Sequence, residues 1–339
     1  MTTTSKRSTT TRRTNARRPL TPAQRARKDA EYTERAEALH AELTSKVSQL
    51  VASDQWTAFL NFTASFHHYS LNNTLLILAQ CPTASQVAGW DKWRKLGRKV
   101  NQKCSIRIYG RPFYTVKDKD AKTGEETKRR VACRPPIVCV WDISQTEPIP
   151  GMAQPGELAR RLSGEDDANI YDRVATVLLE RGWDVSREEI PGEKNGYTTL
   201  TGPRRVVVDA GLAPAQAAKT LIHELAHVIL HADPFRAAED AGDEIPPLHR
   251  GIWETEAESV AYVVAAMLGL DTSDYSVGYV AGWTDGNSDL VAQTATRVHA
   301  AAVEIAKALD IDATAEDSTA EHETGDEPAL AESARRFAA

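Results

Sequence analysis

Residues 220–231 read TLIHELAHVILH and carry the side chains of this chain that are best suited to chemistry. His223 and His227 are four residues apart, so on a helix they lie on adjacent turns of one face. Two histidines so placed can bind one Zn²⁺ at about 2.0–2.1 Å, and Glu224 between them can take a proton from water as a general base. The pattern predicts a zinc-dependent hydrolase site.

A catalytic zinc ion takes three protein ligands, so the chain must supply one more. The stretch WETEAESVAYVVAAMLG at residues 253–269 offers Glu254 and Glu258, one helical turn apart. Glu254 is favoured as the third ligand, with Glu258 as a partner that orients a ligand or as the alternative ligand. Glu256 is expected on the solvated face of the same helix.

Other residues near the motif are weighed as the third ligand. His231 is excluded, because it lies about 12 Å from His223 along a helix axis, too far to share the ion. A loop residue can reach a metal as readily as a helical one, which leaves three further candidates for the third ligand: Asp233, Asp240 and His249. Tyr275 and Tyr279 could donate a hydrogen bond to an oxyanion, although tyrosines are more often core residues. Amide hydrolysis is the expected reaction, with Zn²⁺ favoured and Mn²⁺ or another divalent metal also compatible.

The elements that must position these residues follow two periodicities. Apolar residues at helical spacing predict helices near 23–52, 54–66, 71–79, 169–181, 214–231, 254–268 and 289–309. Alternating or short apolar runs predict strands near 106–116, 137–141, 183–186, 197–200 and 205–209, and the charged insert 117–130 is expected to form a hairpin tip. Strands ahead of the HExxH helix and helices after it indicate an α+β fold.

The chain is long enough for two domains with tails. The stretch EPIPGMAQPG at 147–156 predicts a linker over 147–165, between domains at 30–146 and 166–312. Residues 1–28 contain nine Lys or Arg and no acid, whereas 310–327 contain eight Asp or Glu and no base. We therefore expect a disordered basic arm at 1–29 and a disordered acidic tail at 313–339.

The hydropathy predicts where the protein is found, and the spacing of its cysteines predicts their chemical state. No apolar run is long enough to span a membrane and the first residues lack an apolar signal core, so a cytoplasmic protein without membrane contact is expected. The cysteines form no CxxC pair and lie in or beside apolar runs, so we expect free structural thiols at Cys81, Cys104, Cys133 and Cys139.

A basic stretch at residues 89–103 contains two tryptophans. Charged grooves with aromatic platforms hold single-stranded nucleic acid without sequence preference, which makes the following residues candidates: Trp90, Lys92, Trp93, Arg94, Lys95, Arg98, Lys99 and Lys103. A solvated helix explains such charges equally well, and the aromatic residues of 56–66 fit a core.

Two resemblances extend these readings. HELAH followed by the ExxA of ETEAESVA resembles the ImmA/IrrE group of gluzincin-like metallopeptidases, and it implies Glu254 as the third ligand. The motifs YSLNNTLLIL at 69–78, Q-x-P at 80–82 and GWDKWRKLGRKV at 89–100 resemble the ArdC antirestriction family. That family implies an N-terminal domain that binds single-stranded DNA, with Tyr69 and Asn73 as further candidates, and a Spartan-like protease domain. The family's usual Gly-rich basic turn is replaced by NQKCS at 101–105.

Three functions follow from these observations. The leading hypothesis is a DNA-associated zinc metalloendopeptidase of a mobile element, with single-stranded DNA and a protein or peptide substrate as partners. The second is a non-catalytic DNA-binding protector with a structural metal site. The third is an ImmA-like protease that cleaves a repressor and has no DNA affinity.

Overall fold

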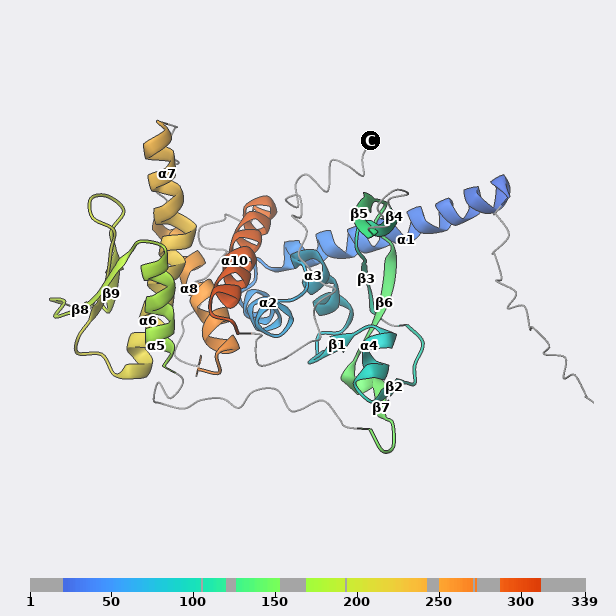
Figure 1. Ribbon diagram of the computed structural model, residues 1–339, viewed down its shortest axis with the longest axis horizontal. Coiled ribbons are helices and arrows are strands. Elements are labelled where there is room, and N and C mark those ends of the chain that lie inside the picture. The colour runs from blue at the N-terminus through green and yellow to red at the C-terminus, as the bar shows by residue number, and fades with distance from the viewer. Residues whose placement is uncertain are drawn as a thin grey trace, which may run out of the picture.

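The computed structural model describes residues 21–104, 106–119, 126–152, 169–192, 194–242, 250–270, 272 and 287–311. Helices and strands are mixed within two domains, which confirms the α+β prediction (Figure 1). Among the described helices, none is long and apolar enough to cross a membrane.

The first domain opens with three helices. They are α1 (Pro22–Gln49), α2 (Ser53–Phe66) and α3 (Leu71–Gln80). Thr21 and Gln24 form a capping box that starts α1, so residues 22–29 of the expected arm are helical. Residues 1–20 of that arm and the tail at 313–339 lie outside the described residues.

The strands of the first domain form small antiparallel sheets. One sheet has the order β1 (Val87–Ala88), β6 (Ile137–Asp142), β3 (Ile106–Tyr109). After α4 (Trp90–Lys95), β2 (Arg98–Val100) pairs with β7 (Thr146–Pro148), and η1 (Ile143–Gln145) precedes β7. A hairpin pairs β4 (Phe113–Lys119) with β5 (Glu126–Ala132), so most of the insert at 117–130 is strand.

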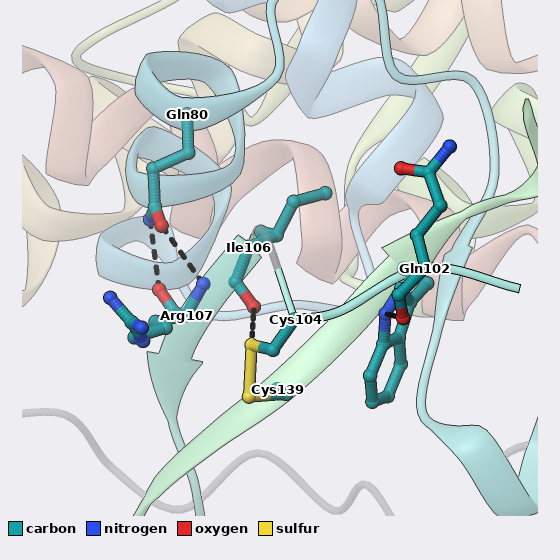
Figure 2. The surroundings of a disulfide bond; sticks show 7 residues. Gln80, Gln102, Cys104, Ile106, Arg107 and Cys139 are labelled. Atoms are coloured by element: carbon teal, nitrogen blue, oxygen red, sulfur yellow. Dashed lines mark hydrogen bonds between the residues drawn. A yellow bond between two sulfur atoms is a disulfide. The ribbon is translucent and has the colours of Figure 1, made fainter. Parts of the chain in front are cut away.

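A disulfide joins Cys104 to Cys139 across this domain, with 5.5 Å between the Cα atoms (Figure 2). The expectation of free thiols is therefore wrong for this pair and confirmed for Cys81 and Cys133. The two residues are 35 apart in the sequence, and only the antiparallel pairing of β3 with β6 brings them together. Figure 2 also shows Gln80 hydrogen-bonded to the backbone of Arg107 on β3, beside the disulfide.

The second domain builds a three-stranded sheet and packs helices on it. After α5 (Ile170–Glu180), the strands take the order β8 (Asp184–Glu188), β10 (Arg205–Asp209), β9 (Gly196–Thr198), so β9 lies at an edge. Helix α6 (Pro214–His227) runs directly into the π-helical turn η2 (Val228–Ala232) and α7 (Asp233–Ala241). Two longer helices follow, α8 (Arg250–Met267) and α10 (Ser288–Ala308).

The two domains share one continuous core of buried apolar side chains. Helix α2 lies against α8 at the centre of the molecule (Figure 1). At this seam Trp56 Nε1 donates to Ser259 Oγ at 3.1 Å, and Tyr262 Oη donates to Asn61 Oδ1 at 2.9 Å. Most of the predicted linker, from residue 153, lies outside the described residues.

Candidate metal centre

Helix α6 places His223 and His227 side by side, because buried Leu221 and Leu225 fix the opposite face of the helix in the core. Their Nε2 atoms are 3.0 Å apart, and the two rings meet edge to face with centroids 4.7 Å apart. Both nitrogens therefore point to the same place, as the HExxH spacing predicts.

Helix α8 brings Glu254 to the same place. Its Oε2 lies 3.6 Å from the Nε2 atoms of both His223 and His227. The three ligand atoms lie within 4.8 Å of one another, so this group can hold a metal ion.

The other candidate ligands lie elsewhere. Asp233 accepts a hydrogen bond from Trp183 Nε1 at 3.0 Å and pairs with Arg181 at 3.4 Å. Asp240 is exposed near the end of α7, while His249, Tyr275 and Tyr279 lie outside the described residues.

Glu224 is buried beside the histidines. Its Oε2 accepts a hydrogen bond from Thr198 Oγ1 on β9 at 2.7 Å. Burial raises the pKa of Glu224, although the adjacent His223 and His227 act in the opposite direction. Gly196 makes room for this carboxylate, since a Cβ there would lie 2.8 Å from Thr220 Cγ2 and 3.1 Å from Glu224 Oε1.

The carboxylates and imidazoles of the site shift one another's pKa values. Burial alone would lower the pKa of His223, but its contacts with Glu254 and Glu258 outweigh that effect and raise the pKa to about 10. The close approach of His223 and His227 holds the pKa of Glu254 well below its usual range. Negative charge at Glu254 therefore faces two imidazole nitrogens, an arrangement that attracts a cation.

Two further glutamates of α8 lie behind the histidines. Glu258 Oε2 is 3.2 Å from His223 Nδ1, which fits the expected orienting role. Glu256 is only 1% exposed, so its expected place on a solvated face is wrong. It pairs with Arg297 at 3.1 Å and contacts buried His231, because the shared core covers this side of α8 as well.

A cleft of about 760 Å³ opens beside the site. Its walls include the three ligand candidates, Glu224 and the edge strand β9, and two lysines, Lys194 and Lys219, also line it. A cleft of this size accommodates a drug-sized or short peptide ligand.

Four of the residues predicted to contact nucleic acid make structural contacts within the first domain. Trp93 is 1% exposed and donates from Nε1 to the carbonyl of Trp141 at 2.8 Å. Tyr69 donates to the carbonyl of Val87, and burial raises its pKa to about 12. Two more make structural hydrogen bonds, Asn73 to both backbone polar groups of Tyr109 and Arg98 to Thr146.

The remaining predicted contacts lie at the surface of the same domain. Trp90 is 49% exposed, and the guanidinium of Arg94 lies 5.5 Å from its ring centroid. Lys95, Lys99 and Lys103 are exposed, and Lys92 is partly buried. An exposed ring with a guanidinium beside it suits base stacking.

Some residues of the site cannot be predicted from the sequence alone. Thr198 and Gly196 carry no sequence signal, since their roles depend on how β9 lies against α6. The spacing of His231, four residues after His227, does carry a signal, since residues four apart on a helix can contact one another.

Comparison with known proteins places both domains. Residues 29–135 match the N-terminal domain of anti-restriction factor ArdC, and residues 180–310 match the IrrE N-terminal-like domain. Uncharacterized protein pXO2-81 of Bacillus anthracis is 25% identical over 289 residues, covering 74% of this chain and 47% of the relative. The chain thus spans about half the length of that relative.

Two solved structures of the antirestriction ArdC protein from the R388 plasmid also align. The metal-free structure is 21% identical with a TM-score of 0.42, covering 74% of this chain and 87% of that one. The Mn(II)-bound structure is 17% identical with a TM-score of 0.40, covering 74% and 86%. By these two domain matches the chain resembles the ArdC-like antirestriction proteins, with an ArdC-type first domain joined to an IrrE-like second domain.

Proposed function

We propose that this protein is a DNA-associated zinc metallopeptidase, which binds single-stranded DNA and hydrolyses peptide bonds during the protection of incoming DNA. The observation that carries the proposal is the convergence of His223, His227 and Glu254 beside buried Glu224, at the wall of an open cleft. A purely structural zinc site usually has four protein ligands and no such opening.

The donor set supports a divalent metal. Two imidazoles and one carboxylate with a free side are the ligands of many catalytic zinc sites, and Mn²⁺ also accepts them. Such an ion, when bound, polarises a carbonyl and makes water more acidic.

Glu224 is the proposed general base. Glu224 follows His223 directly in the sequence and lines the cleft. Thr198 donates a hydrogen bond to one oxygen of its carboxylate. A carboxylate whose pKa is raised by burial accepts a proton from attacking water and later passes it to the leaving amine.

The edge strand beside the cleft supports a peptide substrate. Strand β9 forms one rim and lies at the edge of its sheet. Extended peptides bind such edges by adding a strand, which would carry a peptide bond past Glu224.

The single-stranded DNA partner is proposed for the first domain. Exposed Trp90 with Arg94 over its ring provides a stacking platform, and exposed Lys95, Lys99 and Lys103 provide positive charge. A partner of this kind also motivates the proposed cytoplasmic location.

The test compares wild type with Glu224→Gln, which keeps the shape of the side chain but removes the base. We expect both proteins to bind one equivalent of Zn²⁺ and to bind oligo-dT equally, and Glu224→Gln to lose cleavage of casein or of itself by at least about 100-fold. Trp90→Ala should weaken oligo-dT binding without changing the zinc content, whereas Leu179→Ala, an exposed apolar residue of the second domain, should change neither.

Different outcomes point to the alternatives. Cleavage by wild type without any affinity for DNA would favour a repressor-cleaving regulator. DNA binding by both proteins without cleavage by either would favour a non-catalytic protector with a structural metal site.

A further inference from the structure

The glutamates at alternate positions of α8 contact different histidines around the site. Glu254 faces the Nε2 atoms of the two histidines, and Glu258, one turn later, contacts Nδ1 of His223. Glu256 lies about 200° round the helix from Glu254, at about 100° per residue, and reaches buried His231 instead. Neither Glu256 nor His231 has a role in the proposed function.

A chain of hydrogen bonds leads from Glu256 to the metal site. His231 Nε2 lies 3.0 Å from Glu256 Oε2, and His231 Nδ1 lies 3.1 Å from Nδ1 of His227. The ring of His231 stacks on Trp253, with centroids 4.6 Å apart and planes 9° apart. His231 belongs to the π-helical turn Val228–Ala232, which follows His227 directly. This turn places the His231 ring next to the His227 ring.

The chemistry of these groups gives the chain one direction. Glu256 accepts from Arg297, which balances its charge, so its carboxylate accepts from His231 Nε2–H as well. A neutral imidazole has one N–H, so His231 Nδ1 must then accept a hydrogen bond. The donor is Nδ1–H of His227, which leaves the lone pair of His227 Nε2 facing His223 and Glu254.

We propose that Glu256 and His231 are positioning residues that fix His227 as the Nδ1–H tautomer and so present its Nε2 lone pair to the metal. This inference rests on the proposed metal site. Glu258 acts on His223 directly in the same sense, so each ligand histidine has an acceptor at Nδ1, one immediate and one relayed through His231. Partners of this type typically contribute about 10- to 100-fold to metal affinity.

Two variants at position 231 separate positioning from packing. His231→Leu keeps an apolar body but removes the acceptor, whereas the amide oxygen of His231→Asn restores an acceptor for His227 Nδ1–H. We expect His231→Leu to bind Co²⁺ about 10- to 100-fold more weakly than wild type and His231→Asn to recover most of that loss. Glu256→Gln, which keeps an oxygen near His231, should bind Co²⁺ better than Glu256→Leu.

Nitrogen NMR of the histidine side chains in the full-length, metal-free protein reads the tautomer itself, among only nine histidines. We expect His227 to carry its proton on Nδ1 in wild type and His231→Asn, and to exchange between tautomers in His231→Leu. Thermal unfolding of each metal-free variant reports separately on packing.

The inference is overturned if His231→Leu keeps both the Co²⁺ affinity and the His227 tautomer of wild type, whatever its melting temperature. It is also overturned if wild-type His227 is protonated at Nε2. A wild type that binds no divalent metal would instead overturn the proposed function, and the tautomer measurement on the metal-free protein would still decide the hydrogen-bond chain.

Discussion

At the scale of single residues, the position of the proposed base, Glu224, depends on a residue that has no side chain. Gly196 lies where a Cβ would meet Thr220, the carbonyl of Val207 at 3.0 Å and the carboxylate of Glu224. We expect Gly196→Ala to displace Glu224, lower peptidase activity at least about tenfold, and destabilise the fold by about 1–3 kcal/mol through overpacking. Activity assays and urea unfolding measure the two effects.

Gly251→Ala on α8 is the matched control, because a Cβ there meets nothing within 4 Å. Alanine also favours a helix over glycine by about 1 kcal/mol, so this variant should be active and slightly more stable. Equal activity of Gly196→Ala and Gly251→Ala would contradict the close approach of β9 to Glu224.

Local spacing explains which site residues could be predicted. The places of His223, His227 and Glu224 follow from helical periodicity, and the pairing of Glu254 with them needs only one returning helix. The roles of Thr198 and Gly196 depend on the register of an edge strand, and the burial of Glu256 depends on the helix that covers it. None of the three could be predicted from spacing along the sequence. The tryptophans of 89–103 looked alike in sequence, yet Trp93 is core and Trp90 is exposed.

At the scale of elements, α2 of the first domain holds the helix that carries three glutamates of the site. The indole of Trp56 donates to Ser259, the residue after Glu258, at a fully buried position. Trp56→Phe keeps an aromatic ring but leaves the Ser259 hydroxyl without this donor. We expect a loss of about 1–3 kcal/mol in the free energy of unfolding, measured in urea.

A double-mutant cycle with Ser259→Ala isolates the hydrogen bond from the change in ring size. Trp56→Phe should cost less in the Ser259→Ala background than in wild type. A coupling energy near zero would show that the seam depends on apolar packing alone.

The Cys104–Cys139 disulfide makes a second prediction for elements, since it fixes the segment before β3 to the middle of β6. Thiol titration of unfolded, non-reduced protein should count two free thiols, Cys81 and Cys133, and four after reduction. Replacing both bonded cysteines by serine should cost about 2–4 kcal/mol.

The matched control replaces Cys81 and Cys133 by serine, which removes thiols but no crosslink. Four thiols in protein trapped directly at cell lysis would mean that the bond forms only after extraction. Sequence spacing gave no sign of this pair, because cysteines 35 residues apart become neighbours only through strand pairing.

At the scale of the whole molecule, His299 makes the seam between domains sensitive to pH. It lies on α10, is buried, and is bonded to the backbone of Tyr69 in the first domain. Burial and the charge of His67 lower its pKa from 6.5 to about 4. The unfolded chain therefore binds a proton near pH 6.5, while the folded chain resists it until about pH 4.

The contribution of His299 to stability is present above pH 6.5 and is lost as the pH falls towards 4. The loss amounts to about 3 kcal/mol in the free energy of unfolding, at about 1.36 kcal/mol per pKa unit. Urea unfolding at several pH values should show this slope in wild type and a smaller one in His299→Leu. Equal slopes would place the pH response elsewhere.

The prediction of the fold held best where segments are local. The predicted helices and strands lie close to their observed ranges, except that the helix expected over 214–231 becomes π-helical after His227. The short elements α4, α7, β1, β2 and β7 had no prediction. The continuity of the core across the two domains did not follow, because a Pro- and Gly-rich stretch indicates only where the chain is free of regular structure, not whether the flanking domains touch.

That shared core restricts how such proteins can diversify by recombination. An exchange of either domain for one that lacks these partners would separate Trp56 from Ser259 and leave a buried polar group unmatched on each side of the seam. Descent of the two halves as a linked pair is therefore favoured over free shuffling, and chimeras should fold only when α2 and α8 are transferred together.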